Sequence, residues 1–203
     1  MSIFTKAYER TKALEGVYSD DPEDRGGETV NGIARKYWGD WQGWKIIDEL
    51  KSKIESFKAL EQAILHHPVI AAYAMQFYRV EFWDFLKLDN APDQDIANEL
   101  FDTAVNQGRT AAAKYMQEAL NLLNENQKLF SDLKTDGLIG AKTLAAYNIY
   151  SSTSSRASRT KQGVLSTFLK CLNGLQFEHY RTFVKNNPEQ ERFFYGWLNN
   201  RIS

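Results

Sequence analysis

Apolar side chains recur every three or four residues along most of this chain, which predicts a succession of amphipathic helices. The first stripe runs through Phe4, Tyr8 and Thr11, with Ala7 and Leu14 beside it. From residue 44 onward the same period continues almost to the end of the sequence. Alternation of period two is not sustained outside residues 16–33. The expected fold class is therefore all-α, with a small irregular loop or hairpin after the first helix.

Turn-forming residues mark where these helices should end. The stripe that begins at Ile47 should stop at His67-Pro68, because proline disfavours a helical conformation in the residue before it. Asp93 is expected to cap a later helix that closes at Gly108. Further breaks are expected near residues 135–140, 151–155 and 186–188.

Residues 16–33 interrupt the helical pattern with Gly, Asp, Asn and Pro, which supply turn chemistry. Long loops in compact domains often carry function. One further step along the first apolar stripe lands on Glu15, at the start of this segment. A carboxylate at the end of an apolar face would be partly desolvated, and its pKa would be raised. The alternative is a helix-end glutamate that faces solvent.

The charge of the chain is balanced overall, with 25 basic and 26 acidic residues among 203, so a nucleic-acid partner is not expected. The balance is uneven, since residues 151–203 carry a net charge of +5 and residues 1–150 one of −6. This basic tail could favour an anionic polymer, or it could be a solvated helix face.

Cofactor and metal chemistry find little support. Cys171 is the only cysteine, which excludes an internal disulfide and a cysteine-based zinc site. The adjacent pair His66 and His67 would point in different directions on a helix, and the acidic cluster around residues 20–24 lacks the spacing of a calcium loop. No cofactor and no metal are expected, and no apolar stretch is long enough for membrane insertion.

The carboxylates around the polar segment suit glycoside hydrolysis. This reaction needs a protonated acid for the leaving oxygen and a second group on the opposite face of the sugar. Glu15 has the environment of such an acid, and Asp24 and Thr29, beyond the loop, could hold a water molecule. Asp20 and Asp21 lie between Glu15 and Asp24 in the sequence and are candidate substrate contacts.

The run from Leu14 to Ile33 resembles the opening of glycoside hydrolase family 108, whose signature is Glu-Gly-Gly-Tyr, Asp-Pro and Asp-x-Gly-Gly-x-Thr-x-x-Gly-Ile. The second half resembles the peptidoglycan-binding region that accompanies that domain. The matching blocks are Phe82–Asp84, Phe101–Gly108, Met116–Asn121 and Asp136–Leu144.

This resemblance implies a lysozyme-like helical fold and hydrolysis of the β-1,4 bond between N-acetylmuramic acid and N-acetylglucosamine. It implies Glu15 as the catalytic acid and, by similarity to phage-type lysozymes, Asp24 and Thr29 as the residues that position a water. Val17 departs from the family pattern, which prefers glycine there, so the local turn is expected to differ.

Other side chains are candidates for binding the sugar chain. Tyr18 could stack on a sugar ring or pin the loop to the core. Trp41, with Trp38 and Trp44, offers flat apolar faces for pyranose rings, although helix packing is the more common use of tryptophan. Asn106 could face the cleft or serve the helix end before Gly108.

The expected organisation is a muramidase region at 1–90 and a helical peptidoglycan-binding region at 91–203, packed as one monomeric unit whose partner is the peptidoglycan glycan strand. Two alternatives stay open: a lytic transglycosylase acting on the same bond, and a non-catalytic peptidoglycan-binding or secretion-helper protein. The N-terminus lacks a signal-peptide pattern. We expect cytoplasmic synthesis, followed by release to the cell wall through a holin, a secretion system or lysis.

Overall fold

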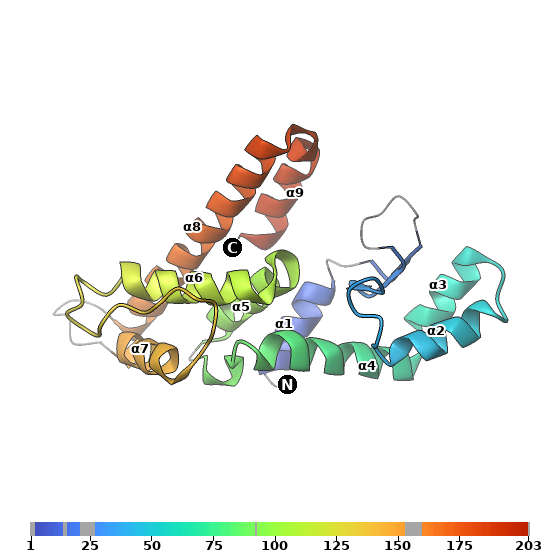
Figure 1. Ribbon diagram of the computed structural model, residues 1–203, viewed down its shortest axis with the longest axis horizontal. Helices are drawn as coiled ribbons and strands as arrows, with labels where there is room; N and C mark the ends of the chain where they lie inside the picture. Colours follow the sequence, from blue (N-terminus) through green and yellow to red (C-terminus); the bar gives the residue numbers. More distant parts are fainter. Residues whose placement is uncertain (1–2, 14–15, 21–26, 92, 153–159, 203) are drawn as a thin grey trace. The chain divides into compact units, whose positions relative to one another are not determined.

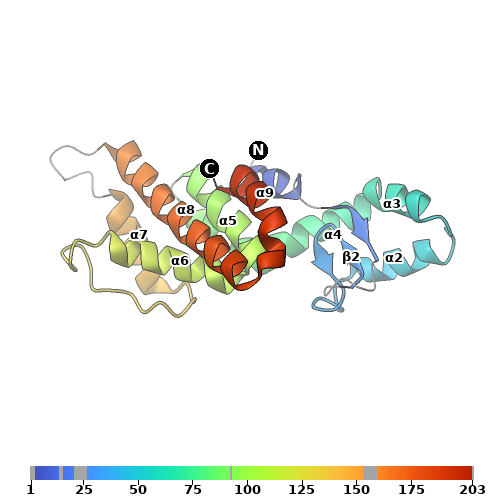
Figure 2. The ribbon, with the colours of Figure 1, turned by 90° about the horizontal axis from the view of Figure 1, so that it is seen from above.

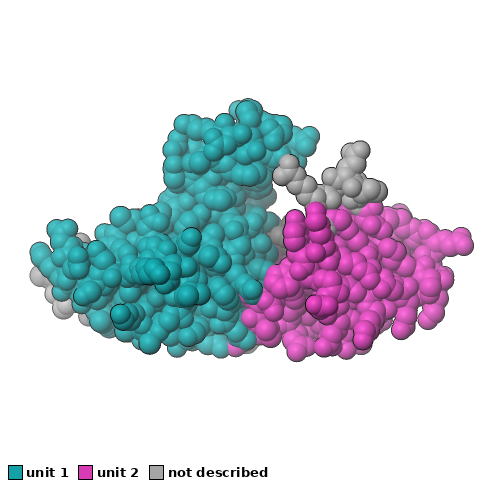
Figure 3. Space-filling view, viewed as in Figure 1, with its two compact units in different colours: residues 1–7, 82–203 teal, residues 8–81 magenta. Residues whose placement is uncertain are grey.

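The chain divides into two units. A computed structural model describes residues 3–13, 16–20, 27–91, 93–152 and 160–202. The hairpin unit spans Tyr8–Glu81, and the helical unit comprises Met1–Ala7 and Phe82–Ser203; Figure 3 colours them separately. Each unit has its own core and is described by itself.

A small antiparallel sheet lies in the hairpin unit, after helix α1 (Ile3–Lys12). Its strands are β1 (Tyr18–Ser19), β2 (Thr29–Val30) and β3 (Ile33–Ala34), in that order. The turn between β2 and β3 consists of Asn31 and Gly32, both with positive φ. An Asn-Gly pair is the preferred sequence for such a two-residue hairpin turn, because both residues tolerate positive φ.

Three helices complete the hairpin unit: α2 (Gly43–Lys51), α3 (Phe57–Leu65) and α4 (Pro68–Tyr78). The prediction of one apolar stripe from Ile47 to Ile64 is wrong, since two helices share it. Ser56 begins α3 in an extended conformation and accepts a hydrogen bond from the Ala59 amide, so a serine cap starts a new helix there. The predicted stop at Pro68 is confirmed, because His67 caps α4 and the proline takes its first position.

The core of the hairpin unit joins the sheet to α2 and α4. Val30, Ile33, Ile47 and Ile70 are fully buried. The buried Tyr78 hydroxyl donates to the Asn31 carbonyl over 2.8 Å, which fastens α4 to the turn of the sheet. The position of the β2–β3 hairpin is therefore set by helix packing as well as by its own short strands.

The helical unit is built on three long helices, α5 (Gln94–Gln107), α6 (Arg109–Leu122) and α8 (Lys161–Asn186). Helix α7 (Ala141–Ser152) packs against α6 and α8, and α9 (Glu191–Arg201) runs back along α8 (Figures 1 and 2). Short helical turns complete it: the π-helix η1 (Arg79–Asp84), which begins in the hairpin unit, and the 3₁₀ turns η2 (Leu88–Asn90) and η3 (Pro188–Gln190).

Aromatic side chains fill the core of the helical unit. Trp83 and Phe101 are fully buried, with their ring centroids 5.9 Å apart, and Phe4 meets the edge of each ring. Elsewhere in this core the buried Gln176 of α8 donates to Thr103 of α5 over 3.0 Å. The predicted cap at Asp93 is confirmed by its hydrogen bond from the Asp95 amide.

The described residues confirm the expected fold class, an all-α protein with one small sheet after the first helix. In this described part, no helix combines the length and the hydrophobicity that crossing a bilayer requires.

Candidate functional site

A cluster of charged side chains supports the sheet of the hairpin unit, and Glu28 lies at its centre. One Glu28 oxygen accepts from Lys51 Nζ over 2.9 Å and from the Tyr18 hydroxyl over 3.1 Å. The other accepts from the Arg35 guanidinium over 2.7 Å. The Glu28 carboxylate is only 9% exposed, so both of its oxygens are committed to the fold.

The two cations of this cluster each have a second, more exposed carboxylate. Arg35 forms a two-pronged pair with Asp48 of α2, at 2.7 and 2.6 Å. Lys51 also donates to Asp20 over 3.1 Å. The Arg35 guanidinium holds the pKa of Asp48 below its usual value, mainly through this hydrogen bond. The cluster thus joins β1, the start of β2 and α2.

Tyr18 belongs to this cluster rather than to the surface. Its ring is buried, 5.3 Å from that of Phe57, and its hydroxyl donates to Glu28. Burial, followed by the negative charge of Glu28, raises the pKa of Tyr18 to about 12. The sequence left two roles open for Tyr18, stacking on a sugar ring or pinning the loop to the core. A buried, neutral hydroxyl that donates to a carboxylate fits the second role.

Thr29 lies on the central strand, opposite Ser19 on one side and Ala34 on the other. Its side-chain hydroxyl donates to the Gly27 carbonyl over 3.0 Å, and the residue is half-buried. A hydroxyl that already donates its one hydrogen bond to a carbonyl can still accept hydrogen bonds through its lone pairs. Thr29 is therefore oriented to accept from a donor such as water.

Trp41 contributes to a groove of about 220 Å³ within the hairpin unit. The indole nitrogen donates to the Tyr73 carbonyl over 3.3 Å, and Gly43 lies so close to the ring that a side chain there would clash with it. The groove combines three aromatic residues with carboxylate and amide side chains; its lining is Asp40, Trp41, Gln42, Tyr73, Gln76, Phe77, Val80 and Glu81.

Asn106 belongs to the helical unit, near the end of α5. With its amide oxygen turned toward α9, it accepts from the Arg201 guanidinium. Arg201 also pairs with Asp102, one turn earlier on α5, at 3.0 Å and with both side chains about 10% exposed. Asn106 and Asp102 thus anchor the C-terminal helix. This pairing also shows that one cation of the basic tail is used inside the fold.

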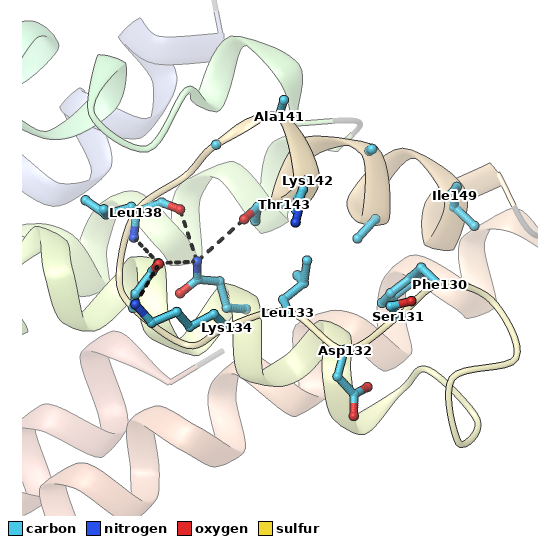
Figure 4. Close-up of a pocket in the computed structure, with 15 residues that line it drawn as sticks. Phe130, Ser131, Asp132, Leu133, Lys134, Leu138, Ala141, Lys142, Thr143 and Ile149 are labelled. Carbon is cyan, nitrogen blue, oxygen red and sulfur yellow. Dashed lines mark hydrogen bonds and ion pairs between the residues drawn. The ribbon is translucent and has the colours of Figure 1, made fainter.

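A second, larger groove of about 700 Å³ lies in the helical unit, between the 130–138 loop and α7 (Figure 4). Its loop is held by side-chain amides of α6 and of the residues just after it. Asn124 donates to the Phe130 carbonyl and accepts from the Phe130 amide, and Asn121 does the same with Leu133. Gln117 donates to the Leu138 carbonyl and accepts from the Gly137 amide.

The described residues bring only some of the predicted site together. Tyr18 and Asp20 share the Glu28 cluster, and Thr29 follows on the next strand. Trp41 lines its own groove, and Asn106 lies in the other unit. Glu15, Asp21 and Asp24 fall outside the residues that the structure describes, so their roles stay predictions.

Several residues at these sites were not predicted. Glu28, Arg35 and Lys51 join segments up to 31 residues apart, and a single sequence gives no signal for such a pairing. The amides on and just after α6 do leave a signal in the sequence, because Gln117, Asn121 and Asn124 are polar residues spaced four and three apart, as on one face of a helix. In the described part of the chain, no group of three or more His, Cys, Asp or Glu residues is arranged to hold a metal ion.

The fold is similar to that of a solved protein, Brucella abortus SagA, with a TM-score of 0.56 over 97% of this chain and 87% of that one. The two sequences are 22% identical. No curated protein sequence matches this chain.

Family models cover nearly the whole sequence. The model described as Glycosyl hydrolase 108 matches residues 8–108, and the one described as Predicted Peptidoglycan domain matches residues 111–202. These matches agree with the resemblance seen in the sequence and make the protein a glycoside hydrolase of peptidoglycan. The chain therefore belongs to glycosyl hydrolase family 108 and carries a predicted peptidoglycan domain after the hydrolase domain.

Proposed function

We propose that this protein is an N-acetylmuramidase that cleaves the β-1,4 bond between N-acetylmuramic acid and N-acetylglucosamine, with Glu15 as general acid. The family supports the substrate polymer and the reaction class. The run from Leu14 to Ile33 supports the bond and the acid, because it carries the glutamate and the loop residues of the muramidase signature.

The observation that carries this assignment is the state of Glu28. A general acid must hold a proton and point it at the leaving oxygen. The two Glu28 oxygens accept from Arg35, Lys51 and Tyr18, and the side chain is only 9% exposed, so this carboxylate is engaged by the fold and largely closed to substrate. Asp20 is likewise engaged by Lys51. These two carboxylates support the sheet, and Glu15, the glutamate of the family signature, is the residue to which we assign the acid role.

The water that completes hydrolysis is assigned to Asp24 and Thr29. The Thr29 hydroxyl donates its hydrogen bond to the Gly27 carbonyl, so toward a water molecule it acts as an acceptor. An acceptor orients the water without removing its proton. Asp24 would then take the proton as general base, in keeping with the two-carboxylate chemistry of glycosidases.

Substrate binding is assigned in part to the Trp41 groove. Tyr18 is buried, so its ring is not available for stacking on a sugar. Trp41 is half-exposed, with its indole fixed by Tyr73 and Gly43. A rigid aromatic face among carboxylate and amide side chains fits a sugar ring, which has an apolar face and hydroxyl edges.

Replacing Trp41 with alanine is expected to raise KM for soluble glycan fragments about 5- to 10-fold, since aromatic contacts contribute about 1 kcal/mol. The value of kcat should change less than twofold, because the indole of Trp41 supplies no acid, base or nucleophile to the reaction. Trp41→Phe should recover most of the affinity, because it restores an aromatic face.

Tyr37→Ala provides the matched control for Trp41. Tyr37 is an exposed aromatic of the same unit, 66% accessible, outside the groove. Its loss should leave KM within twofold of wild type. An unchanged KM for Trp41→Ala, with a folded protein, would remove this groove from the substrate path.

The products of digestion test the proposed bond. Purified peptidoglycan treated with the protein should yield fragments that end in reducing N-acetylmuramic acid, identified by borohydride reduction and mass spectrometry. Ends in 1,6-anhydro-muramic acid would instead show a lytic transglycosylase. Reducing N-acetylglucosamine ends would show cleavage of the other glycosidic bond. Either of these results refutes the muramidase assignment.

A further inference from the structure

The groove of the helical unit has the chemistry of a peptide site rather than a sugar site. Apolar side chains dominate its lining, among them Leu133, Leu138, Ala145 and Ile149. Phe130 is its one aromatic residue among the described lining, and neither tryptophan nor tyrosine contributes. The Trp41 groove of the hairpin unit shows the opposite composition, with three aromatic residues in a much smaller volume.

The groove holds two aspartates and two lysines, so its formal charges balance, and a ligand carboxylate would be attracted only where a lysine has no acidic partner. Its two acidic residues are engaged by the fold: Asp132 accepts from Asn124, and Asp136 accepts from Gln117 and from the Leu138 amide. These hydrogen bonds hold the pKa of Asp136 below its usual value, so it stays ionised without needing a ligand.

Two lysines line the groove as well. The Lys134 side chain is 86% exposed and lies 3.9 Å from Asp136. Lys142 is also exposed, in the first turn of α7, and among the described residues it has no ion pair or hydrogen-bond partner. The positive end of the α7 dipole adds to its field. A carboxylate in the groove would thus find Lys142 available.

The groove is already formed without a ligand. Gln117 and Asn124 are buried, at 1% and 0% exposure, and with Asn121 they hold the loop at three points. Gly137 has a φ of +80° and lies against Thr110, so another residue there would be strained. Figure 4 shows hydrogen bonds that end on Leu138 and Thr143 at the edge of the groove, with Leu133 and Lys134 on the loop nearby. A preformed site avoids the entropic cost of ordering a loop on binding.

We propose that this groove binds the stem peptide of peptidoglycan, a short peptide with free carboxylates and small aliphatic side chains. Its carboxylates would meet Lys142 and Lys134, and its methyl groups would meet Leu138, Ala145 and Ile149. A volume of about 700 Å³ is within the range for a ligand of several residues. The inference rests on the proposed function only in taking peptidoglycan as the polymer; it does not depend on which bond is cleaved.

The test is calorimetric titration of the full-length protein with two soluble probes. One is a free stem tetrapeptide without sugar, and the other is a tetrasaccharide of N-acetylglucosamine without peptide. The protein should bind the tetrapeptide, and Lys142→Glu should weaken this binding at least tenfold. A glutamate in the first turn of α7 is compatible with the helix dipole, so the variant should stay folded.

Lys170→Glu provides the matched control, since Lys170 is an exposed lysine of α8 outside the groove. It should bind the tetrapeptide within twofold of wild type, and amide chemical shifts should change in residues 130–145. Three results would overturn the proposal: no tetrapeptide binding, equal weakening by both substitutions, or shifts confined to other residues. Binding of the tetrasaccharide should be unaffected by Lys142→Glu, and its loss would point to a glycan site instead. Failure of the muramidase proposal would appear separately, in the products of digestion.

Discussion

Glu15→Gln should lower kcat on peptidoglycan by about 100- to 10,000-fold, the range that a general acid contributes. Glutamine has nearly the same shape as glutamate but carries no acidic proton for the leaving oxygen. KM should change little, because the substitution removes an interaction made in the transition state. The free energy of unfolding should stay within about 1 kcal/mol of the wild-type value, because glutamine keeps the size and shape of the side chain.

Glu9→Gln is the control for this substitution. Glu9 is an exposed carboxylate on α1, six residues before Glu15, and the same chemical change there should leave kcat within twofold. Both proteins are measured by the release of reducing ends and by thermal unfolding. If Glu15→Gln keeps more than a tenth of the wild-type kcat, another group supplies the proton.

Glu28→Gln should destabilise the hairpin unit by about 2–3 kcal/mol. Removing one partner of a fully buried ion pair costs about 3–5 kcal/mol, because the other charge is left without compensation. The cost here is smaller because Arg35 and Lys51 are about one-third exposed and each keeps a second carboxylate. Unfolding in urea, followed by tryptophan fluorescence, gives the change in free energy.

Asp48→Asn tests whether the burial of Glu28 is the reason for the large loss of stability expected for Glu28→Gln. Asp48 pairs with the same Arg35, but its side chain is 53% exposed. Exposed pairs contribute about 0–1 kcal/mol, so this variant should lose less than 1 kcal/mol. Equal losses for the two variants would show that Glu28 is not the centre of the cluster. Activity should fall with stability for Glu28→Gln, since the cluster supports the strand that carries Thr29.

The sheet was predictable because its signals are local. Asn31-Gly32 supplies the two positive φ values of a hairpin turn, and residues 16–33 lack a helical period. Most helices were predictable for the same reason, since apolar spacing and the cap at Asp93 lie within single elements. The break at Ser56 was missed because an apolar period continued across it, and one serine cap was enough to start a new helix.

The interactions that organise the candidate site could not be predicted from the sequence. The sequence shows Glu28, Arg35 and Lys51 as ordinary surface charges, and only packing of the sheet against α2 brings both cations within 3 Å of Glu28. The candidate role of Tyr18 was open for the same reason, since its burial depends on Phe57 and Glu28. The assignment of Glu15 as the acid depends on sequence resemblance, and it is therefore tested by the activity and products of the Glu15→Gln variant.

The central claim is that Glu15 drives hydrolysis at the muramic acid bond, and one comparison addresses it directly. Purified peptidoglycan is digested with equal amounts of wild type, Glu15→Gln and Glu9→Gln, and the glycan ends are identified by mass spectrometry. We predict reducing N-acetylmuramic acid ends from wild type and Glu9→Gln, and at most about 1% of that amount from Glu15→Gln. Equal amounts of these ends from all three proteins would contradict the account.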